Sequence, residues 1–223
     1  MAKNYCVIPA RGGSKRIKKK NLKDFLGKPI LAYSIENAKN SKLFCEIYVS
    51  SDDDEILDFA LKSGVKTLKR PSELSDDYAG TREVVMHFIK ELNLKDSFVC
   101  CLYATAPLLK VETLQKAFKM LDESCYTFPA VEYDYSPFRA FAIKDNKNKM
   151  LFKEHFTKRS QDLQKVYHDA GQFYIAKAKT WLHKENIFED SKSLIVSALE
   201  AQDIDVLQDW EIAELKYKKL HNS

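Results

Sequence analysis

The feature that most constrains the fold is an alternation along the chain between short apolar runs and segments with helical periodicity. Residues 5–9, 46–50 and 98–103 have the length and apolar character of buried strands. Apolar side chains recur at helical spacing in the segments between them, for example in residues 29–40. Strands that alternate with helices are typical of a mostly parallel sheet covered by helices. We therefore predict an α/β fold of this kind.

The alternation of predicted strands and helices continues over most of the chain. Further strands are expected at residues 65–68, 127–131, 172–176 and 194–199, and further helices at 53–63, from 80 onward, at 111–123 and at 207–220. Residues 133–165 break this alternation, because their charged and aromatic residues show neither helical nor strand periodicity. We predict one domain spanning residues 1–223, with an inserted arm at about 133–165.

Composition excludes several classes of protein. Apolar residues make up 45% of the 223, enough for a sizeable core. The longest apolar runs are far shorter than the roughly 20 residues that cross a bilayer, and we expect no secretion signal. The five cysteines lack C-x-x-C spacing: Cys6, Cys45, Cys100, Cys101 and Cys125. We therefore expect a cytoplasmic protein with reduced core thiols, no membrane partner and no sulfur-bound metal.

Positive charge is concentrated near the N-terminus, although the formal net charge is only +4. Between residues 11 and 28 the chain carries a dense run of Lys and Arg against a single acid, Asp24. Charge alone leaves three alternatives open, namely a solvated loop, a nucleic-acid-binding patch and a polyphosphate site. Gly12, Gly13 and Ser14 lie within the run, directly after a predicted strand, and adjacent glycines let backbone approach a ligand closely. The segment therefore predicts a phosphate-binding loop.

Neither of two common nucleotide motifs is present in this loop, since both G-x-x-x-x-G-K-[ST] and G-x-G-x-x-G are missing. Residues 8–16, followed by Lys20-Asn21-Leu22 and by residues 26–30, instead resemble the N-terminal motif of the CMP-sialic acid synthetase family, the sugar-activating cytidylyltransferases. The resemblance implies a Rossmann-like nucleotidyltransferase sheet and a loop that binds the triphosphate of CTP. It places the nucleotide at Ala10, Arg11, Gly12, Gly13, Ser14, Lys15, Lys20 and Asn21.

A second segment extends the resemblance on the nucleotide side. Residues 70–74 read R-P-S-E-L, similar to the family's R-P-x-E-L motif, and are followed by an acidic pair, Asp76 and Asp77, and by Thr81. Alone, such residues are also typical of turns and helix caps. Within the resemblance, Arg70 and Thr81 belong to the nucleotide site.

The sugar side departs from the family's sialic acid pattern. Residues 102–108 read L-Y-A-T-A-P-L where sialic acid synthetases commonly show L-Q-P-T-S-P-L, and residues 168–173 read H-D-A-G-Q-F where they carry a shorter version. Both segments resemble the pseudaminic acid branch of the family. N-acetylneuraminic, legionaminic and 3-deoxy-manno-octulosonic acids remain alternative substrates, and a lone His-Asp pair is otherwise typical of a structural turn. The resemblance implies an acidic nine-carbon sugar at Tyr103, Thr105, His168, Asp169 and Gln172.

Two carboxylates near the C-terminus form the candidate metal site. Asp203 and Asp205 follow an expected apolar strand, where residues i and i+2 point to the same side. Oxygen ligands of this kind suit Mg²⁺, which substrate phosphates usually complete. A solvated turn or a helix cap is the alternative for any D-x-D. Residues 204–209 resemble the family's I-D-T-x-x-D motif, with Val206 in place of the threonine, and this places Mg²⁺ here.

The resemblance also implies the reaction. The anomeric hydroxyl of the sugar attacks the α-phosphorus of CTP and pyrophosphate leaves, with Arg11, Lys20 and Asp205 as the catalytic residues. A comparable arm in the family helps to form a homodimer, and the product would feed a bacterial surface glycan or glycosylated flagellin. The alternative from another class is a non-catalytic protein that binds nucleic acid through its basic loop. The D-x-D and the lack of a second basic face argue against a nucleic-acid partner.

Overall fold

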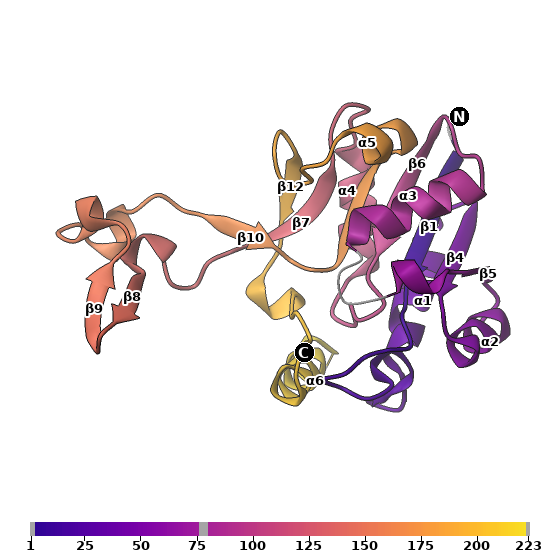
Figure 1. Ribbon diagram of the computed structural model, residues 1–223, viewed down its shortest axis with the longest axis horizontal. Coiled ribbons are helices and arrows are strands. Elements are labelled where there is room, and N and C mark those ends of the chain that lie inside the picture. The colour runs from indigo at the N-terminus through magenta and orange to yellow at the C-terminus, as the bar shows by residue number, and fades with distance from the viewer. Residues whose placement is uncertain (1–2, 76–79, 222–223) are drawn as a thin grey trace.

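The computed structural model describes residues 3–75 and 80–221, so the acidic pair Asp76 and Asp77 lies outside the described residues. Its centre is an eight-stranded sheet with the order β10-β7-β11-β6-β1-β4-β5, in which β12 also pairs with β7 (Figure 1). Helices cover both faces of this sheet. The predicted α/β fold with a mostly parallel sheet is confirmed.

The parallel half of the sheet is built around β1 (Lys3–Pro9). This strand pairs in parallel with β4 (Glu46–Ser51) on one side and with β6 (Ser97–Leu102) on the other, and β4 pairs in parallel with β5 (Lys66–Lys69). Cys6, Val7 and Ile8 in β1 are all wholly buried. Burial on both faces explains why β1 and β6 read as continuous apolar runs instead of alternating patterns.

The other half of the sheet is mainly antiparallel. β11 (Phe173–Lys177) runs antiparallel to β6 and to β7 (Thr127–Glu132), and the short β10 (Tyr167–Asp169), which was not predicted, runs antiparallel to β7. The strand expected at 194–199 is wrong in its bounds, because β12 covers Lys192–Ile195. Ser197 accepts a hydrogen bond from the backbone of Leu199 and starts a 3-10 turn, η6 (Ala198–Glu200), which ends the extended stretch.

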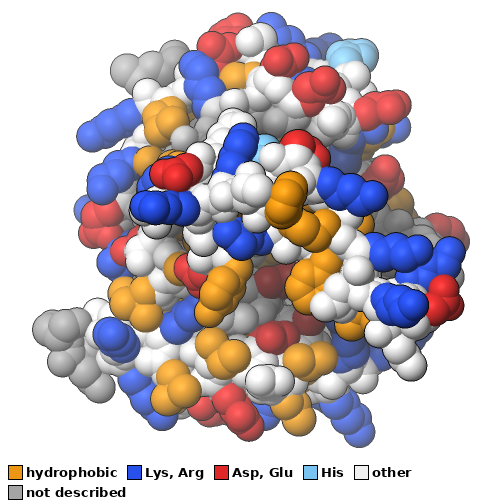
Figure 2. Space-filling view, turned by 90° about the vertical axis from the view of Figure 1, so that its left-hand side faces the viewer, with side chains coloured by type: hydrophobic (Ala, Val, Ile, Leu, Met, Phe, Trp, Pro, Cys, Tyr) orange, Lys and Arg blue, Asp and Glu red, His pale blue; other side chains and the backbone are white. Residues whose placement is uncertain are grey.

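An arm projects from the sheet between β7 and β10 (Figure 1). The expectation of irregular structure at 133–165 is wrong in part, because the arm contains a hairpin of β8 (Phe141–Lys144) and β9 (Lys147–Met150). Asp145 and Asn146 form its two-residue turn with φ of 52° and 56°, the backbone that such hairpins require. Figure 2 views the molecule from the side on which the arm projects and shows several apolar side chains at this surface. The arm also holds the 3-10 turns η3 (Pro137–Arg139), η4 (Lys153–His155) and η5 (Ser160–Asp162).

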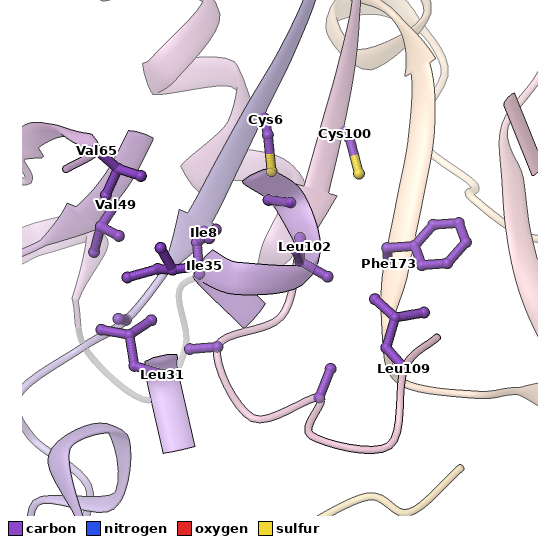
Figure 3. Packing of buried hydrophobic residues seen from close by; sticks show 14 of the residues in the cluster. Cys6, Ile8, Leu31, Ile35, Val49, Val65, Cys100, Leu102, Leu109 and Phe173 are labelled. Carbon is purple, nitrogen blue, oxygen red and sulfur yellow. The ribbon is translucent and has the colours of Figure 1, made fainter. Parts of the chain in front are cut away.

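Two apolar clusters fix helices on opposite faces of the sheet. One cluster joins the sheet to α1 (Ile30–Ser41), α2 (Asp54–Lys62) and α4 (Val111–Lys119). Figure 3 shows its packing, with Ile35 of α1 close to Ile8 of β1. The second cluster joins the other face to α3 (Thr81–Glu91) and to α5 (Ala178–His183), which was not predicted.

Helix α4 ends before the predicted residue 123 because Asp122 forms its own turn. The Asp122 carboxylate accepts hydrogen bonds from the backbone and hydroxyl of Ser124, which compete with the helical pattern. The last helix, α6 (Leu207–His221), packs through Trp210 and Ala213 against Phe25 in the small β2–β3 hairpin (Asp24–Phe25 and Lys28–Pro29). The C-terminal helix is thus placed beside the basic loop.

Two further observations concern the cysteines and the length of the helices. All five cysteines are free thiols, and every one except Cys45 is buried. Within residues 3–75 and 80–221 there is no helix with the length and apolar character needed to cross a membrane.

Candidate active site

A pocket of about 280 Å³ opens where the parallel strands end. Pro9 closes β1, Arg70 follows β5 and Tyr103 follows β6, so the pocket lies at the carboxyl edge of the sheet, where open α/β sheets bind ligands. Its lining comprises Pro9, Arg11, Ser14, Lys15, Arg16, Ile17, Lys20, Asn21, Arg70, Leu74, Gly80, Thr81, Val84, Tyr103, Ala104, Thr105 and Asp205.

The pocket brings together most of the residues predicted for the site. Those that line it are Arg11, Ser14, Lys15, Lys20, Asn21, Arg70, Thr81, Tyr103, Thr105 and Asp205. Ala10, Gly12 and Gly13 belong to the same loop without lining the pocket, and the remaining predicted residues lie outside the lining: His168, Asp169, Gln172 and Asp203.

Hydrogen bonds to residues at and just after the end of β4 hold the basic loop in place. The backbone N–H of Ala10 donates to the carbonyl of Ser50 at 2.9 Å, and that of Gly12 donates to Asp52 Oδ1 at 3.0 Å. A Cβ added to Gly12 would lie 2.5 Å from Asp53 Oδ2, so only glycine allows this approach. The nearly buried Asn21 donates from Nδ2 to the carbonyl of Arg11 at 2.9 Å. These bonds fix the loop before any ligand arrives.

Lys20 joins the loop to the segment that carries the two aspartates. Its Nζ donates to the carbonyl of Ile204 at 2.8 Å. Burial lowers the pKa of Lys20, while the nearby carboxylates of Asp205 and Asp203 act in the opposite direction. A second link is the ion pair between Arg16 Nη2 and Asp205 Oδ1 at 2.8 Å. Cations from one end of the chain thus face carboxylates from the other.

The aspartate segment does not have the secondary structure that was predicted. Ile204 is wholly buried in the cluster around α6, whereas Asp203 is exposed and Asp205 lines the pocket. The segment is no strand end, since residues 201–205 follow η6 and belong to no helix or strand. Asp209 accepts hydrogen bonds from the backbone of Asp205 and Val206, both at 2.9 Å, and these bonds lower its pKa.

Mg²⁺, expected from the resemblance, fits this donor set when a substrate supplies further oxygens. In the part of the chain that the structure describes, no group of three or more His, Cys, Asp or Glu side chains is placed to hold a metal ion. Burial, and then the negative charge of Asp205, raises the pKa of Asp203. A divalent cation near both carboxylates offsets that charge, and Mg²⁺ commonly takes only one or two carboxylates beside phosphate oxygens. The residues fit a metal that is bound together with a polyphosphate.

Arg70 is a buried cation in the lining of the pocket. Only 4% of the residue is exposed, and burial lowers the pKa of its guanidinium. Its Nε donates to Ser75 Oγ at 3.0 Å, and its Nη2 lies 4.0 Å from the same Asp52 Oδ1 that accepts from Gly12. Asp52 therefore contacts both the loop and Arg70.

A hydroxyl network links the pocket to the H-D-A-G-Q-F segment. Tyr103 Oη and Thr81 Oγ1 lie 2.7 Å apart, and burial raises the pKa of Tyr103 to about 12. The Tyr103 ring packs against that of Tyr174 with centroids 5.7 Å apart, and Tyr174 Oη donates to Asp169 Oδ2 at 2.5 Å. The buried Ser34 of α1 holds this region by donating to the carbonyl of Tyr103 at 2.8 Å. Asp169 is thus linked to the pocket indirectly, through Tyr174 and Tyr103.

His168 and Gln172 occupy different surroundings. His168 is exposed at the root of the arm, with its ring 4.7 Å from that of Tyr133 and its Nδ1 2.8 Å from the carbonyl of Asp169. Gln172 is nearly buried, and its Nε2 donates to the carbonyl of Glu200 at 2.5 Å. The sugar-binding roles predicted for these two residues stay predictions.

Sequence reasoning named Arg16 as a phosphate-neutralising cation of the loop without its pairing to Asp205, and it missed Asp52 as a site residue. Arg16 lies within the basic run and pairs with Asp205, whereas Asp52 belongs to the polar sequence S-S-D-D at the end of β4. The rule that carboxyl ends of parallel strands meet at one edge could have found Asp52, because β1 and β4 are neighbours.

Comparison with known proteins places this geometry in context. The cytidylyltransferase family matches residues 5–218. A pseudaminic acid cytidylyltransferase of Campylobacter jejuni is 48% identical over 229 residues, covering 99% of this chain and 99% of the relative. A Helicobacter pylori protein described as pseudaminic acid cytidylyltransferase and UDP-2,4-diacetamido-2,4,6-trideoxy-beta-L-altropyranose hydrolase is 42% identical, over 93% of this chain and 41% of its own length.

Among solved structures, a CMP:2-keto-3-deoxy-manno-octonic acid synthetase complexed with CTP has the same fold. The TM-score is 0.74 at 15% sequence identity, and the alignment covers 98% of this chain and 100% of that chain. At this identity the likeness extends to the arrangement of helices and strands alone.

Proposed function

Because the chain belongs to the cytidylyltransferase family, we propose that it transfers CMP from CTP to the anomeric hydroxyl of pseudaminic acid and releases pyrophosphate. The full-length identity of 48% to a relative named for this activity agrees with the predicted pseudaminic acid branch. The structural observation that carries the proposal is the pocket itself. It joins the basic loop to Asp205, which lies 189 residues from the Arg16 that it pairs with.

The loop suits the triphosphate of CTP. Arg11, Lys15 and Lys20 all line the pocket, and cations fixed before the reaction stabilise the charge that develops on phosphoryl oxygens. Lys20 is held in place by the carbonyl of Ile204, so little reorganisation is needed when phosphate replaces water. We assign the triphosphate to this loop and the remainder of the nucleotide to the wall that contains Arg70 and Thr81.

Asp203 and Asp205 are the residues that we assign to Mg²⁺. When bound, Mg²⁺ supplies a Lewis acid that stabilises charge on the phosphate oxygens. Asp205 lines the pocket directly, and Arg16 and Lys20 hold its segment against the loop. The Asp205 carboxylate is therefore held beside the cations that we assign to phosphate, and Asp203 is two residues away, outside the lining.

The sugar is assigned to the side of the pocket formed by Tyr103 and Thr105. Both residues line it, and the hydroxyl pair of Tyr103 and Thr81 presents donors and acceptors suited to a polar sugar. Asp169 supports this side through Tyr174. N-acetylneuraminic, legionaminic and 3-deoxy-manno-octulosonic acids are the alternatives that the experiment below includes.

We infer further that the arm forms a homodimer with a second copy of the chain. Its apolar side chains are unusually exposed for a single molecule, and these are Tyr135 at 91%, Ile143 at 71%, Phe156 at 67%, Leu151 at 60% and Phe141 at 53%. Contiguous exposed apolar surface of this kind marks interaction sites. Sedimentation should report a dimer for the wild type and a monomer for Ile143→Asp. The control Leu215→Asp changes an equally exposed leucine on α6 and should remain dimeric.

We place the reaction in the cytoplasm and its product in the assembly of a bacterial surface glycan or glycosylated flagellin. Five free thiols fit a reducing compartment. The proposed fate of the product depends on pseudaminic acid being the substrate.

The decisive experiment is pyrophosphate release from CTP and Mg²⁺ with the four sugars offered separately. Release with pseudaminic acid and with none of the others is the expected result. Release with a different sugar would keep the reaction and overturn the substrate. No release with any sugar, from protein that binds CTP, would overturn the assignment of an acidic sugar as acceptor. Asp205→Asn serves as the control for release by a contaminating enzyme.

A further inference from the structure

The segment that carries Asp203 and Asp205 lacks the usual source of rigidity. Residues 201–205 belong to no helix or strand, so no backbone ladder holds them. Ligand positions that are accurate to a fraction of an ångström need a support of their own. In this segment the support comes from side chains of other elements, which bind its backbone carbonyls.

The first support is Lys216 on α6. Its Nζ donates to the carbonyl of Ala198 at 2.8 Å and to that of Ala201 at 2.7 Å, so one ammonium group bridges the ends of the η6 turn. Burial lowers the pKa of Lys216, which is the expected cost of removing a cation from water. Two carbonyl acceptors offset that cost, and they fix the backbone two residues before Asp203.

The second support is Gln172, between β10 and β11. Its side-chain Nε2 donates to the carbonyl of Glu200 at 2.5 Å, and its backbone carbonyl accepts from the backbone N–H of Tyr103 at 2.8 Å. Only 3% of Gln172 is exposed, so water cannot replace this amide readily. The Glu200 side chain is itself paired with Lys110 at 2.5 Å. Gln172 therefore ties the aspartate segment to the strand end that supplies Tyr103.

The far end of the segment is fixed independently. Lys20 binds the carbonyl of Ile204, Asp209 binds the N–H groups of Asp205 and Val206, and the Ile204 side chain is wholly buried. With both ends held, the position of the Asp203 and Asp205 carboxylates depends on the anchors at each side. Lys216 and Gln172 are the anchors on the side of residues 198–201.

We propose that Gln172 and Lys216 are positioning residues, which hold residues 198–201 so that Asp203 and Asp205 are presented together at the pocket. This inference rests on the proposed function and deepens it. It gives Gln172 a role that differs from the sugar contact predicted from the sequence. In this role Gln172 affects the Mg²⁺ dependence of the reaction, because it holds the carbonyl of Glu200.

Four variants of the full chain test the proposal. Gln172→Met and Lys216→Met remove the donors while retaining side-chain length. Lys216→Arg keeps donors that can reach both carbonyls. Lys218→Met removes an exposed lysine from the same helix and is the matched control. Thermal unfolding verifies that each variant is folded before it is compared.

Two readouts are expected to change. Amide hydrogen exchange in residues 198–206 should become faster in Gln172→Met and Lys216→Met, without CTP or metal present. The Mg²⁺ concentration for half-maximal pyrophosphate release should rise by about 10-fold or more, the usual effect of removing a residue that orients metal ligands.

The KM for the sugar and the binding of CTP without metal should stay within about 2-fold of wild type, since a 2-fold change is below about 0.5 kcal/mol. Lys216→Arg should recover most of both changes, and Lys218→Met should match wild type.

Other results would overturn the proposal. A raised KM for the sugar in Gln172→Met, with unchanged Mg²⁺ dependence, would show that Gln172 contacts the sugar. Unchanged exchange in residues 198–206 would show that these donors do not hold the segment. If Lys216→Met fails to fold, Gln172→Met and Lys216→Arg still decide the matter. Failure of the proposed function is distinguishable, because it would appear as absent turnover in the wild type, whereas the exchange measurement needs no substrate.

Discussion

Gly12 offers the sharpest test of how the basic loop is built, because its neighbour Gly13 supplies a matched control. A Cβ at Gly12 would lie 2.5 Å from Asp53 Oδ2 and 2.7 Å from Asp53 Cβ. A Cβ at Gly13 would meet no atom within 4 Å. Neither glycine has a backbone conformation that L residues rarely adopt, so Gly12→Ala and Gly13→Ala differ in packing alone.

The magnitude follows from the contacts that must give way. Ordinary contact begins at 3.4 Å, so the loop or the Asp53 turn has to move by about 0.9 Å. Such a movement strains the bond from the Gly12 N–H to Asp52 and the cap in which Asp53 accepts from Glu55 and Ile56. Overpacking typically costs about 1–3 kcal/mol, and part of a helix cap adds about 1. At about 3 kcal/mol, the melting temperature of a chain of this size falls by roughly 6–12 °C.

Thermal unfolding measures the loss of stability, the pyrophosphate-release assay measures kcat, and calorimetry measures CTP affinity. Gly12→Ala should lose several degrees of stability and about 100-fold in kcat, since a displacement near 1 Å misplaces catalytic groups by that factor. Gly13→Ala should keep the stability of the wild type, and any loss that it shows should appear only in CTP affinity. A Gly12→Ala variant as stable as wild type would refute the reasoning that the loop is pressed against Asp53.

Three further predictions concern charge and burial. Asp205→Asn should lower kcat by about 100-fold in a pyrophosphate assay, because the proposed Mg²⁺ site at the pocket loses a carboxylate ligand and with it the metal's stabilisation of phosphate charge. Burial raises the pKa from 10.0 to about 12 in three tyrosines, namely Tyr33, Tyr103 and Tyr126. Their folded state favours the neutral phenol, so thermal unfolding should show full stability below pH 10 and a progressive loss as the pH rises to about 12. Cys45 should react with a thiol reagent in the native protein, whereas Cys101, whose pKa burial raises, should react only after unfolding.

The sequence was sufficient to predict the parallel half of the sheet. β1 and β6 are buried on both faces and therefore appear as apolar runs of strand length between segments of helical period. The predictions failed where one polar residue decides the boundary. Asp122 ends α4 early by binding Ser124, and Ser197 ends β12 by starting a 3-10 turn. Periodicity describes apolar faces, and such local polar bonds do not alter it.

The arm shows a different limit. Its hairpin turn, Asp145-Asn146, carries residues that accept left-handed backbone, yet the strands on either side are exposed along most of their length. Without a buried face there is no alternation of apolar and polar residues to reveal a strand. In the proposed dimer a second copy covers these strands, so their apolar side chains pack at an interface and not in the core of one chain.

The site was predictable to the extent that its residues are adjacent in sequence. The basic loop and the D-x-D carry their chemistry within a few residues, and Arg11, Lys20 and Asp205 do line one pocket. The contacts that position them join residues far apart, as Gly12 joins Asp52 across 40 positions. A glutamine such as Gln172 shows the consequence: its type is equally suited to a sugar hydroxyl and to a backbone carbonyl. In the folded chain its Nε2 donates to the carbonyl of Glu200, which the turn after β12 brings near, and the sequence gives no sign of this contact.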